Sequence, residues 1–337
     1  MKKNKTIIIA EIGVNHNGKI EIAKKLVDVA KKAGADYVKF QTFKARNLVQ
    51  KNTKASQYQI NNLGKNITQD TLLKKLELSE NDHKKIIRYC SKRKINFMSS
   101  PFDLESLDLL FSLKIFNIKV ASGEINNLIF LEKLAKIAKK IFLSSGMATL
   151  KEVSKALQIL IKNGAKKKNI FVLHCHTDYP TQLNDVNLLA MNTMKKKFGL
   201  KVGYSDHTEG NETAIAATAM GAKVIEKHIT LNNNMKGPDH RASLNPEKFY
   251  KYVKLIRNTE TLLGSDIKKP TRSEIRNKKF IRKSIVAKKN IKKGEVFSES
   301  NLLCKRPEGG ISPIYWKEVV GKKSKRNFKI DSFIFLK

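Results

Sequence analysis

The chain has 337 residues, 41% of them hydrophobic and 7% aromatic, so it can bury a sizeable core and is not a disordered chain. Its formal net charge is +37, but the lysines are spread along the chain without the interleaved aromatic residues of a nucleic-acid platform. No run approaches the ~18 apolar residues of a membrane helix, and three cysteines without CxxC spacing argue against a disulfide framework. We therefore expect a cytoplasmic globular protein that binds neither nucleic acid nor membrane.

Short β-rich runs alternate with helical patterns along most of the chain. The predicted strands are Thr6–Ala10, Tyr37–Phe40, Asn96–Ser99, Ile118–Ala121, Ile141–Ser144, Ile170–His174, Lys201–Tyr204 and Lys223–Lys227. The predicted helices include Ile20–Ala33, Glu80–Lys92, Leu131–Lys139, Leu150–Asn163, Glu212–Met220 and Pro246–Leu263. A polar insertion with Gln57-Tyr58 and Asn61-Asn62 follows the second strand. Because parallel βα repeats of this number close a barrel, we expect an α/β fold, a TIM (β/α)8 barrel, over residues 1–265.

The pattern changes after the barrel. A polar, charged stretch over residues 266–281 is interpreted as a linker. Short strand-like runs follow at Lys283–Ala287, Val296-Phe297 and Lys329–Phe335, and they predict a small β-rich domain over residues 282–337. So short a segment has little core of its own, and we expect it to lean on another surface.

Polar residues gather at the carboxyl ends of the predicted strands, which meet at one face of a barrel, the face where active sites are built. Lys39 and Lys119 supply positive charge there, and hydroxyl donors come from Ser100, Ser122, Ser144 and Ser205. Glycines after Ser122 and Ser145 let backbone amides approach an anion. The set predicts a cradle for a phosphate or carboxylate.

Two histidines are candidate metal ligands. His207 and His228 lie about one βα unit apart, so they fall on neighbouring strand ends, where neutral imidazoles could hold a divalent ion. Asp206 lies beside His207 in the sequence and Glu226 lies close to His228, and we expect these two carboxylates to orient the histidines. His16, in a loop at the same face, is either a functional residue or a turn residue.

Carboxylates also lie at this face. Glu11 and Glu124 are candidates for acid/base work or for binding sugar hydroxyls, and each could instead be an ion-pair partner of Lys39 or Lys119. In the run His174-Cys175-His176, strand alternation is expected to turn Cys175 toward the core and away from the two histidines.

The ordered motifs resemble the N-acetylneuraminate (sialic acid) synthase family from end to end. The motifs are Ala10–Gly18 (AEIGVNHNG), Val38–Thr42, Ser100–Asp103, Ala121–Glu124, Leu143–Met147, Gly203–Thr208, Glu226–Thr230 and Gly237–His240. The tail resembles the antifreeze-like (SAF) domain of that family through Arg282–Ala287, Ile291–Glu295 and Lys305–Pro307.

The resemblance implies a role for each matching residue. Phosphoenolpyruvate would be held by Lys39, Gln41, Ser100, Lys119, Ser122, Ser144 and Ser205. His207 and His228 would hold a divalent ion, usually manganese in this family, with magnesium or cobalt as alternatives. Glu11, Glu124, Tyr179 and Asp239 would surround the sugar and the metal-bound water. Arg306 would reach the active site of a partner subunit, which implies a domain-swapped homodimer.

The implied activity is a transferase reaction that forms a C–C bond. An N-acetylneuraminate synthase joins phosphoenolpyruvate to N-acetylmannosamine with release of phosphate. The run His174-Cys-His-Thr177-Asp-Tyr179 departs from the asparagine that many members carry there. That departure leaves open a legionaminic or pseudaminic acid synthase acting on a diacetamido-trideoxyhexose. More distant alternatives are a heptulosonate-type synthase, a basic nucleic-acid-binding protein and a sugar-binding module without catalysis.

Overall fold

A computed structural model describes residues 5–54, 60 and 68–337 of the chain. The predicted insertion residues Gln57, Tyr58, Asn61 and Asn62 lie outside the described residues. The chain divides into two compact units, Met1–Gly264 and Ser265–Lys337. In the part of the chain that is described, no helix has the length and apolar character needed to cross a membrane.

The first unit is a closed parallel barrel, which confirms the predicted fold class. Its strands pair in sequence order, and β1 also pairs with β8 to close the ring. The strands are β1 Ile7–Gly13, β2 Tyr37–Thr42, β3 Asn96–Pro101, β4 Asn117–Val120, β5 Lys140–Ser144, β6 Ile170–Cys175, β7 Lys201–Asp206 and β8 Val224–His228. Several strands extend past their predicted ends, so Glu11, Gln41 and His228 lie within strands rather than after them.

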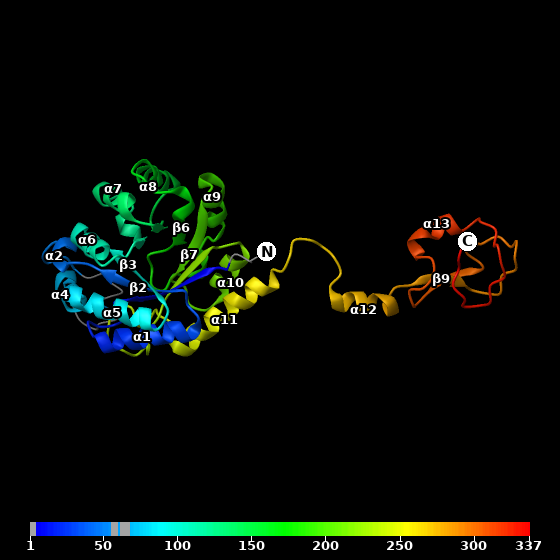
Figure 1. Ribbon diagram of the computed structural model, residues 1–337, viewed down its shortest axis with the longest axis horizontal. Coiled ribbons are helices and arrows are strands. Elements are labelled where there is room, and N and C mark those ends of the chain that lie inside the picture. The colour runs from blue at the N-terminus through cyan, green and yellow to red at the C-terminus, as the bar shows by residue number, and fades with distance from the viewer. Residues whose placement is uncertain (1–4, 55–59, 61–67) are drawn as a thin grey trace. The chain divides into compact units, whose positions relative to one another are not determined.

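Helices surround the strands of this unit (Figure 1). They are α1 Ile20–Ala33, α2 Ala45–Leu48, α4 Gln69–Leu76, α5 Glu80–Lys92, α6 Leu104–Ser112, α7 Leu128–Ile137, α8 Leu150–Lys162, α9 Leu189–Phe198, α10 Glu212–Ala219 and α11 Pro246–Leu262. The first helix buries Leu26, Val27 and Ala30, and it ends where Gly34 takes a left-handed φ of 86°. Glycine adopts that conformation without the steric cost of a side chain.

Strand alternation divides the apolar residues into two cores. Outward-facing residues such as Ile8, Val38 and Ile118 pack against the helices. Inward-facing residues form a separate cluster inside the barrel, made of Ile9, Tyr37, Met98, Phe142, Phe171, Leu173 and Val224. This inner cluster fills the lower part of the barrel, so the polar inward residues of the later strand positions are supported from below.

The second unit holds α12 Arg272–Ile281, β9 Ser284–Ala287, β10 Leu302–Lys305 and α13 Trp316–Val319. Helix α12 lies in the stretch predicted as a linker, where a helix was not expected. Thr271 and Glu274 form a capping box at its start, and none of its residues is buried, so the helix packs no apolar face against a core. The predicted strand Lys329–Phe335 is also wrong in detail, because it forms isolated bridges such as Val286–Phe333.

Gly203 of β7 allows the inner core to close. A Cβ at this position would lie 2.5 Å from the Val224 carbonyl oxygen and 2.6 Å from Leu173 Cδ2. We predict that Gly203→Ala lowers the free energy of unfolding by about 1–3 kcal/mol, because the packed strands cannot make room for the methyl group. Urea denaturation measures this, with Gly123→Ala as the control because its Cβ would meet nothing within 4 Å. Equal stability of the two variants would contradict the prediction.

Candidate active site

One cavity lies at the carboxyl ends of the strands, and every strand of the barrel contributes to it. It is lined by Glu11, Lys39, Gln41, Ser100, Phe102, Lys119, Ala121, Ser122, Gly123, Ser144, Met147, Cys175, His176, Thr177, Tyr179, Ser205, His207, Glu226 and His228. Most of the residues that the sequence nominates therefore come together. The inward positions of the strands repeat every second residue, which is why single residues far apart in the chain meet here.

Two lysines and two glutamates form a buried ionic cluster on the floor of the cavity. Lys39 Nζ lies 2.9 Å from Glu11 Oε1 and 3.6 Å from Glu226 Oε1. Lys119 Nζ lies 3.8 Å from the same Glu226 oxygen. Each of these side chains is 5% exposed or less, so all four charges depend on one another rather than on water.

Burial and pairing shift the pKa values of this cluster in opposite directions. Burial raises the pKa of Glu11 to about 7, with Lys39 opposing the shift and Glu226 adding to it. Burial alone would raise the pKa of Glu226 as well, but Lys119 and Lys39 hold it below its ordinary value. Burial lowers the pKa of Lys119 despite the attraction of Glu226. Glu11 is therefore the member of the cluster that exchanges a proton near neutral pH.

Hydroxyl groups surround the two lysines. Lys39 Nζ donates to Ser100 Oγ at 3.2 Å, and Lys119 Nζ donates to Ser144 Oγ at 2.5 Å. Ser205 Oγ donates to Glu226 Oε1 at 2.9 Å. The arrangement offers cationic and hydroxyl donors to one point of the cavity, as the binding of a phosphate or carboxylate requires.

The Ser122 turn brings the backbone close to the same point. The Gly146 amide donates to Ser122 Oγ at 3.0 Å, and Cys175 Sγ lies 3.2 Å from that oxygen. A Cβ at Gly146 would lie only 2.7 Å from Ser122 Oγ, so the glycine is needed for this close approach.

The expectation that Cys175 faces the core is wrong, since it lines the cavity. In β6 the inward residues are Phe171, Leu173 and Cys175, because the inner core fixes the alternation of the strand. His174 faces the other way, and its Nε2 lies 2.8 Å from the Val186 carbonyl oxygen. His176 lies beyond the strand end and does line the cavity.

Two histidines stand together at the rim. The ring centroids of His207 and His228 are 5.6 Å apart, and Tyr179 stacks on His207 at 4.1 Å. His207 Nδ1 donates to the His176 carbonyl oxygen at 2.5 Å, which leaves the lone pair on Nε2. Burial lowers the pKa of His207 to about 4 and that of His228 well below its ordinary value, so both rings are neutral.

Two neutral imidazole rings in this arrangement could provide two nitrogen ligands to one metal ion. His228 Nδ1 is buried and has no hydrogen-bond partner among the described residues, and the same holds for Glu11 Oε2 and Glu226 Oε2. No group of three or more histidine, cysteine or acidic side chains in the described part of the chain is arranged to hold a metal. Any ion here would therefore complete its coordination with water or substrate.

Three nominated residues of the first unit do not line the cavity. Glu124 is buried beside Asn127, whose Nδ2 donates to Glu124 Oε2 at 2.8 Å, and burial raises its pKa. Asp239 lies in the loop after β8, where burial raises its pKa to about 6. Arg306 is exposed in the second unit. His16 also lies outside the cavity, buried in the turn after β1, where its Nδ1 accepts from the Gly18 amide.

The two acidic residues expected to orient the histidines lie on opposite sides of the barrel wall. Glu226 was expected to orient a histidine, but it faces both lysines in the cavity. Asp206 points outward and pairs with Lys227. Alternation along β7 and β8 carries the missing signal, because it puts Ser205 and His207 inward with Glu226 and His228, and Asp206 outward with Lys227.

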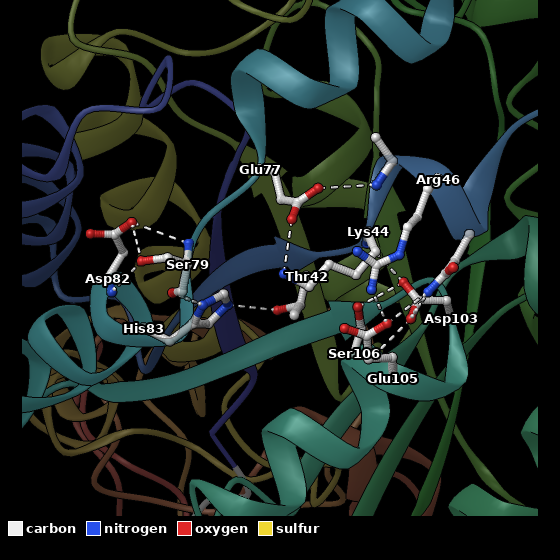
Figure 2. A network of polar contacts seen from close by, with 12 residues as sticks. Thr42, Lys44, Arg46, Glu77, Ser79, Asp82, His83, Asp103, Glu105 and Ser106 are labelled. Atoms are coloured by element: carbon white, nitrogen blue, oxygen red, sulfur yellow. Dashed lines mark hydrogen bonds and ion pairs between the residues drawn. The ribbon is translucent and has the colours of Figure 1, made fainter. Parts of the chain in front are cut away.

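A network of polar contacts joins the carboxyl end of β2 to α5 and to the segment after β3 (Figure 2). Thr42 Oγ1 lies 2.9 Å from His83 Nε2 and 2.7 Å from Ser99 Oγ. Asp103 accepts from the backbone amides of Lys44 and Ser106, at 2.9 and 2.8 Å. Since Thr42 follows Gln41 and Ser99 precedes Ser100, this network holds two cavity residues in place.

Comparison with known proteins identifies both units. The model of the NeuB family matches residues 26–268, and that of the SAF domain matches residues 282–337. An N,N'-diacetyllegionaminic acid synthase of Campylobacter jejuni is 51% identical, covering 98% of this chain and 99% of the relative. A protein of the same name from Legionella pneumophila is 43% identical, covering 95% and 90%. The crystal structure of an N-acetylneuraminic acid synthetase from Leptospira borgpetersenii, in complex with citrate, has a TM-score of 0.71 at 31% identity, covering 82% and 90%.

The buried cluster leads to a prediction on stability. Glu226→Gln keeps the shape of the side chain but leaves Lys39 and Lys119 without one of their two countercharges. We expect a loss on the order of 3 kcal/mol in the free energy of unfolding, since breaking a buried pair exposes an uncompensated charge to the interior. The control is Glu105→Gln, which breaks an exposed pair with Arg46 and should cost at most about 1 kcal/mol. A similar loss in both variants by urea denaturation would refute the prediction.

Proposed function

Since the chain belongs to the NeuB family and ends in a SAF domain, we propose that it is an N,N'-diacetyllegionaminic acid synthase. It joins phosphoenolpyruvate to 2,4-diacetamido-2,4,6-trideoxymannose and water, giving the nine-carbon acid and phosphate. The identities of 51% and 43% to proteins of that name support this acceptor, against 31% for the N-acetylneuraminic acid synthetase. N-Acetylmannosamine, the acceptor expected first from the motifs, becomes the second candidate.

The ionic cluster is the observation that carries the proposal. Phosphoenolpyruvate brings a phosphate and a carboxylate, and Lys39 and Lys119 reach the cavity from neighbouring parts of the barrel with Ser100 and Ser144 beside them. The lysines are already oriented by their glutamate partners, so little side-chain freedom is lost when the anion binds. The open space at Gly123 leaves backbone room for a phosphate oxygen.

The reaction forms a bond between C3 of phosphoenolpyruvate and the aldehyde carbon of the open-chain sugar. Water adds at C2, and the bond from C2 to the phosphate oxygen breaks. The lysines and serines hold the departing phosphate in place throughout. Glu11, with its pKa of about 7 and an unpartnered carboxylate oxygen, is suited to hold a proton at Oε2 and give it to the aldehyde oxygen, which becomes a hydroxyl, while the added water loses its protons as the C2 carbonyl forms.

A divalent ion held by His207 and His228, manganese in the first instance and magnesium or cobalt as alternatives, would supply Lewis-acid chemistry at the aldehyde oxygen. The protein's own contribution is to keep both rings neutral and to fix the tautomer of His207 through the His176 carbonyl. Tyr179, stacked on His207, keeps that ring from turning.

The acceptor is tested by phosphate release from phosphoenolpyruvate with Mn²⁺. We expect kcat/KM for the diacetamido-trideoxymannose to be at least about tenfold higher than for N-acetylmannosamine or the altrose analogue. A tenfold preference corresponds to about 1.4 kcal/mol of additional transition-state stabilisation, which contacts to the groups that only the correct acceptor carries can supply. His207→Ala should abolish release while the far-ultraviolet circular dichroism stays unchanged. Preference for N-acetylmannosamine would move the assignment to an N-acetylneuraminate synthase, and no release with any sugar would overturn the synthase assignment.

The second unit is proposed to serve the cavity of a partner subunit through Arg306, in a domain-swapped homodimer. Its own core is small, built around Ile285, Ile291, Phe297 and Val319, as expected of a domain that packs on another surface.

A complementation experiment tests the swap. His207→Ala and Arg306→Ala chains should each be nearly inactive, and mixing them after partial denaturation should restore part of the activity. Recovery is expected because a mixed dimer has one cavity with both an intact barrel and an intact Arg306. A mixture as inactive as its parents, although mass spectrometry detects mixed dimers, would mean that Arg306 does not act across subunits.

A further inference from the structure

A second buried charged cluster lies outside the barrel wall, behind β7 and β8, and the proposed chemistry does not use it. It consists of Asp206, Lys227 and Tyr252, whose exposed fractions are 1%, 1% and 0%. Charged side chains are seldom buried to this extent unless they are paired, and Asp206 and Lys227 are paired with each other.

The contacts of the cluster join three elements. Lys227 Nζ of β8 lies 3.1 Å from Asp206 Oδ2 at the end of β7. Tyr252 of α11 donates its hydroxyl to the same oxygen at 2.7 Å. The amide and the hydroxyl of Thr208 donate to Asp206 Oδ1 at 2.9 and 2.7 Å, and Lys227 donates back to the Thr208 carbonyl oxygen. Both carboxylate oxygens are therefore occupied.

The position of the cluster along the strands is its informative feature. Asp206 and Lys227 are register partners in the β7–β8 pair. The next residues along the chain are His207, directly after β7, and His228, the last residue of β8, and both turn inward to line the cavity. One ion pair on the outside of the wall thus holds together the two strand ends that carry the histidines on the inside.

A requirement for stability alone does not explain this choice of residues. Apolar side chains of similar volume at the same positions would fill the wall at equal or lower cost, because a buried ion pair seldom recovers its full desolvation penalty. An ion pair that is also hydrogen-bonded by Tyr252 and Thr208 fixes distances and directions that apolar packing leaves adjustable. Such rigidity matters most where the spacing of two ligand side chains sets affinity.

We propose that the Asp206–Lys227–Tyr252 cluster is a positioning device that sets the spacing of His207 and His228, and through it the affinity of the site for a divalent ion. This inference rests on the metal ion in the proposed function. It assigns to α11 a role in the site although no residue of that helix lines the cavity.

The test compares two tyrosines of α11 in the full-length protein. Tyr252→Phe removes only the hydroxyl that bonds to Asp206, whereas Tyr250→Phe removes a hydroxyl from a side chain that is 52% exposed. Mn²⁺ affinity is measured by calorimetry on metal-free protein, with thermal unfolding in chelator and phosphate release as further readouts. Thr208→Val, which deletes a second hydrogen bond to Asp206, is the independent variant should Tyr252→Phe fold poorly.

We expect Tyr252→Phe to bind Mn²⁺ about tenfold more weakly, in the range found when groups that orient metal ligands are removed. Turnover should return at saturating Mn²⁺ with an unchanged KM for phosphoenolpyruvate, and Tyr250→Phe should match the wild type. Unchanged Mn²⁺ affinity in both Tyr252→Phe and Thr208→Val, with only a lower unfolding temperature, would overturn the inference. The inference would also be overturned if the His207→Ala variant bound Mn²⁺ as tightly as the wild type. A wild type that binds Mn²⁺ through His207 but releases no phosphate would sink the proposed function and leave this inference standing.

Discussion

The pairing of Lys39 and Lys119 with Glu11 and Glu226 is the interaction on which the upper part of the barrel depends. Inside a closed ring of strands, none of these groups can reach bulk water, so each charge is stable only beside its partners. The cluster holds two positive and two negative charges when both carboxylates are ionised. With both carboxylates ionised, the barrel interior therefore holds two lysines without an uncompensated charge.

The raised pKa of Glu11 makes it the more easily protonated of the two glutamates in this cluster. An anion that approaches Lys39 and Lys119 competes with the glutamates for the same cations. The negative charge of the anion also disfavours the ionised form of Glu11, whose pKa of about 7 already places it near its protonation point. Uptake of one proton by Glu11 would leave the cluster with a net positive charge facing the anion. Glu11, which balances Lys39, would thus be the carboxylate most easily neutralised by an approaching anion.

The barrel and the residues that line its cavity follow from patterns visible in the chain, because strand ends and alternation are local properties. The expected strands lay within a few residues of the observed ones, and the nominated lysines, serines and histidines of those strand ends lie in one cavity. Cys175 was misassigned because its direction depends on Phe171 and Leu173 packing below it, which is a tertiary constraint. Helix α12 was missed because charged and polar residues dominate it, and its apolar residues Ile275, Phe280 and Ile281 are exposed, so the stretch resembles a linker in composition. Glu226 was undervalued since its partners, Lys39 and Lys119, come from strands far away in sequence.

Alternation also explains why the two faces of β7 and β8 have different tasks. The inward residues Ser205, His207, Glu226 and His228 line the cavity, and Glu226 Oε2 and His228 Nδ1 have no hydrogen-bond partner among the described residues. The outward residues Asp206 and Lys227 face away from the cavity, and both carboxylate oxygens of Asp206 are bonded. Because Glu226 Oε2 and His228 Nδ1 have no such hydrogen bond among the described residues, their positions depend on the backbone that carries them. A saturated network on one side of a strand pair is therefore the physical condition for an unsaturated, ligand-ready set on the other.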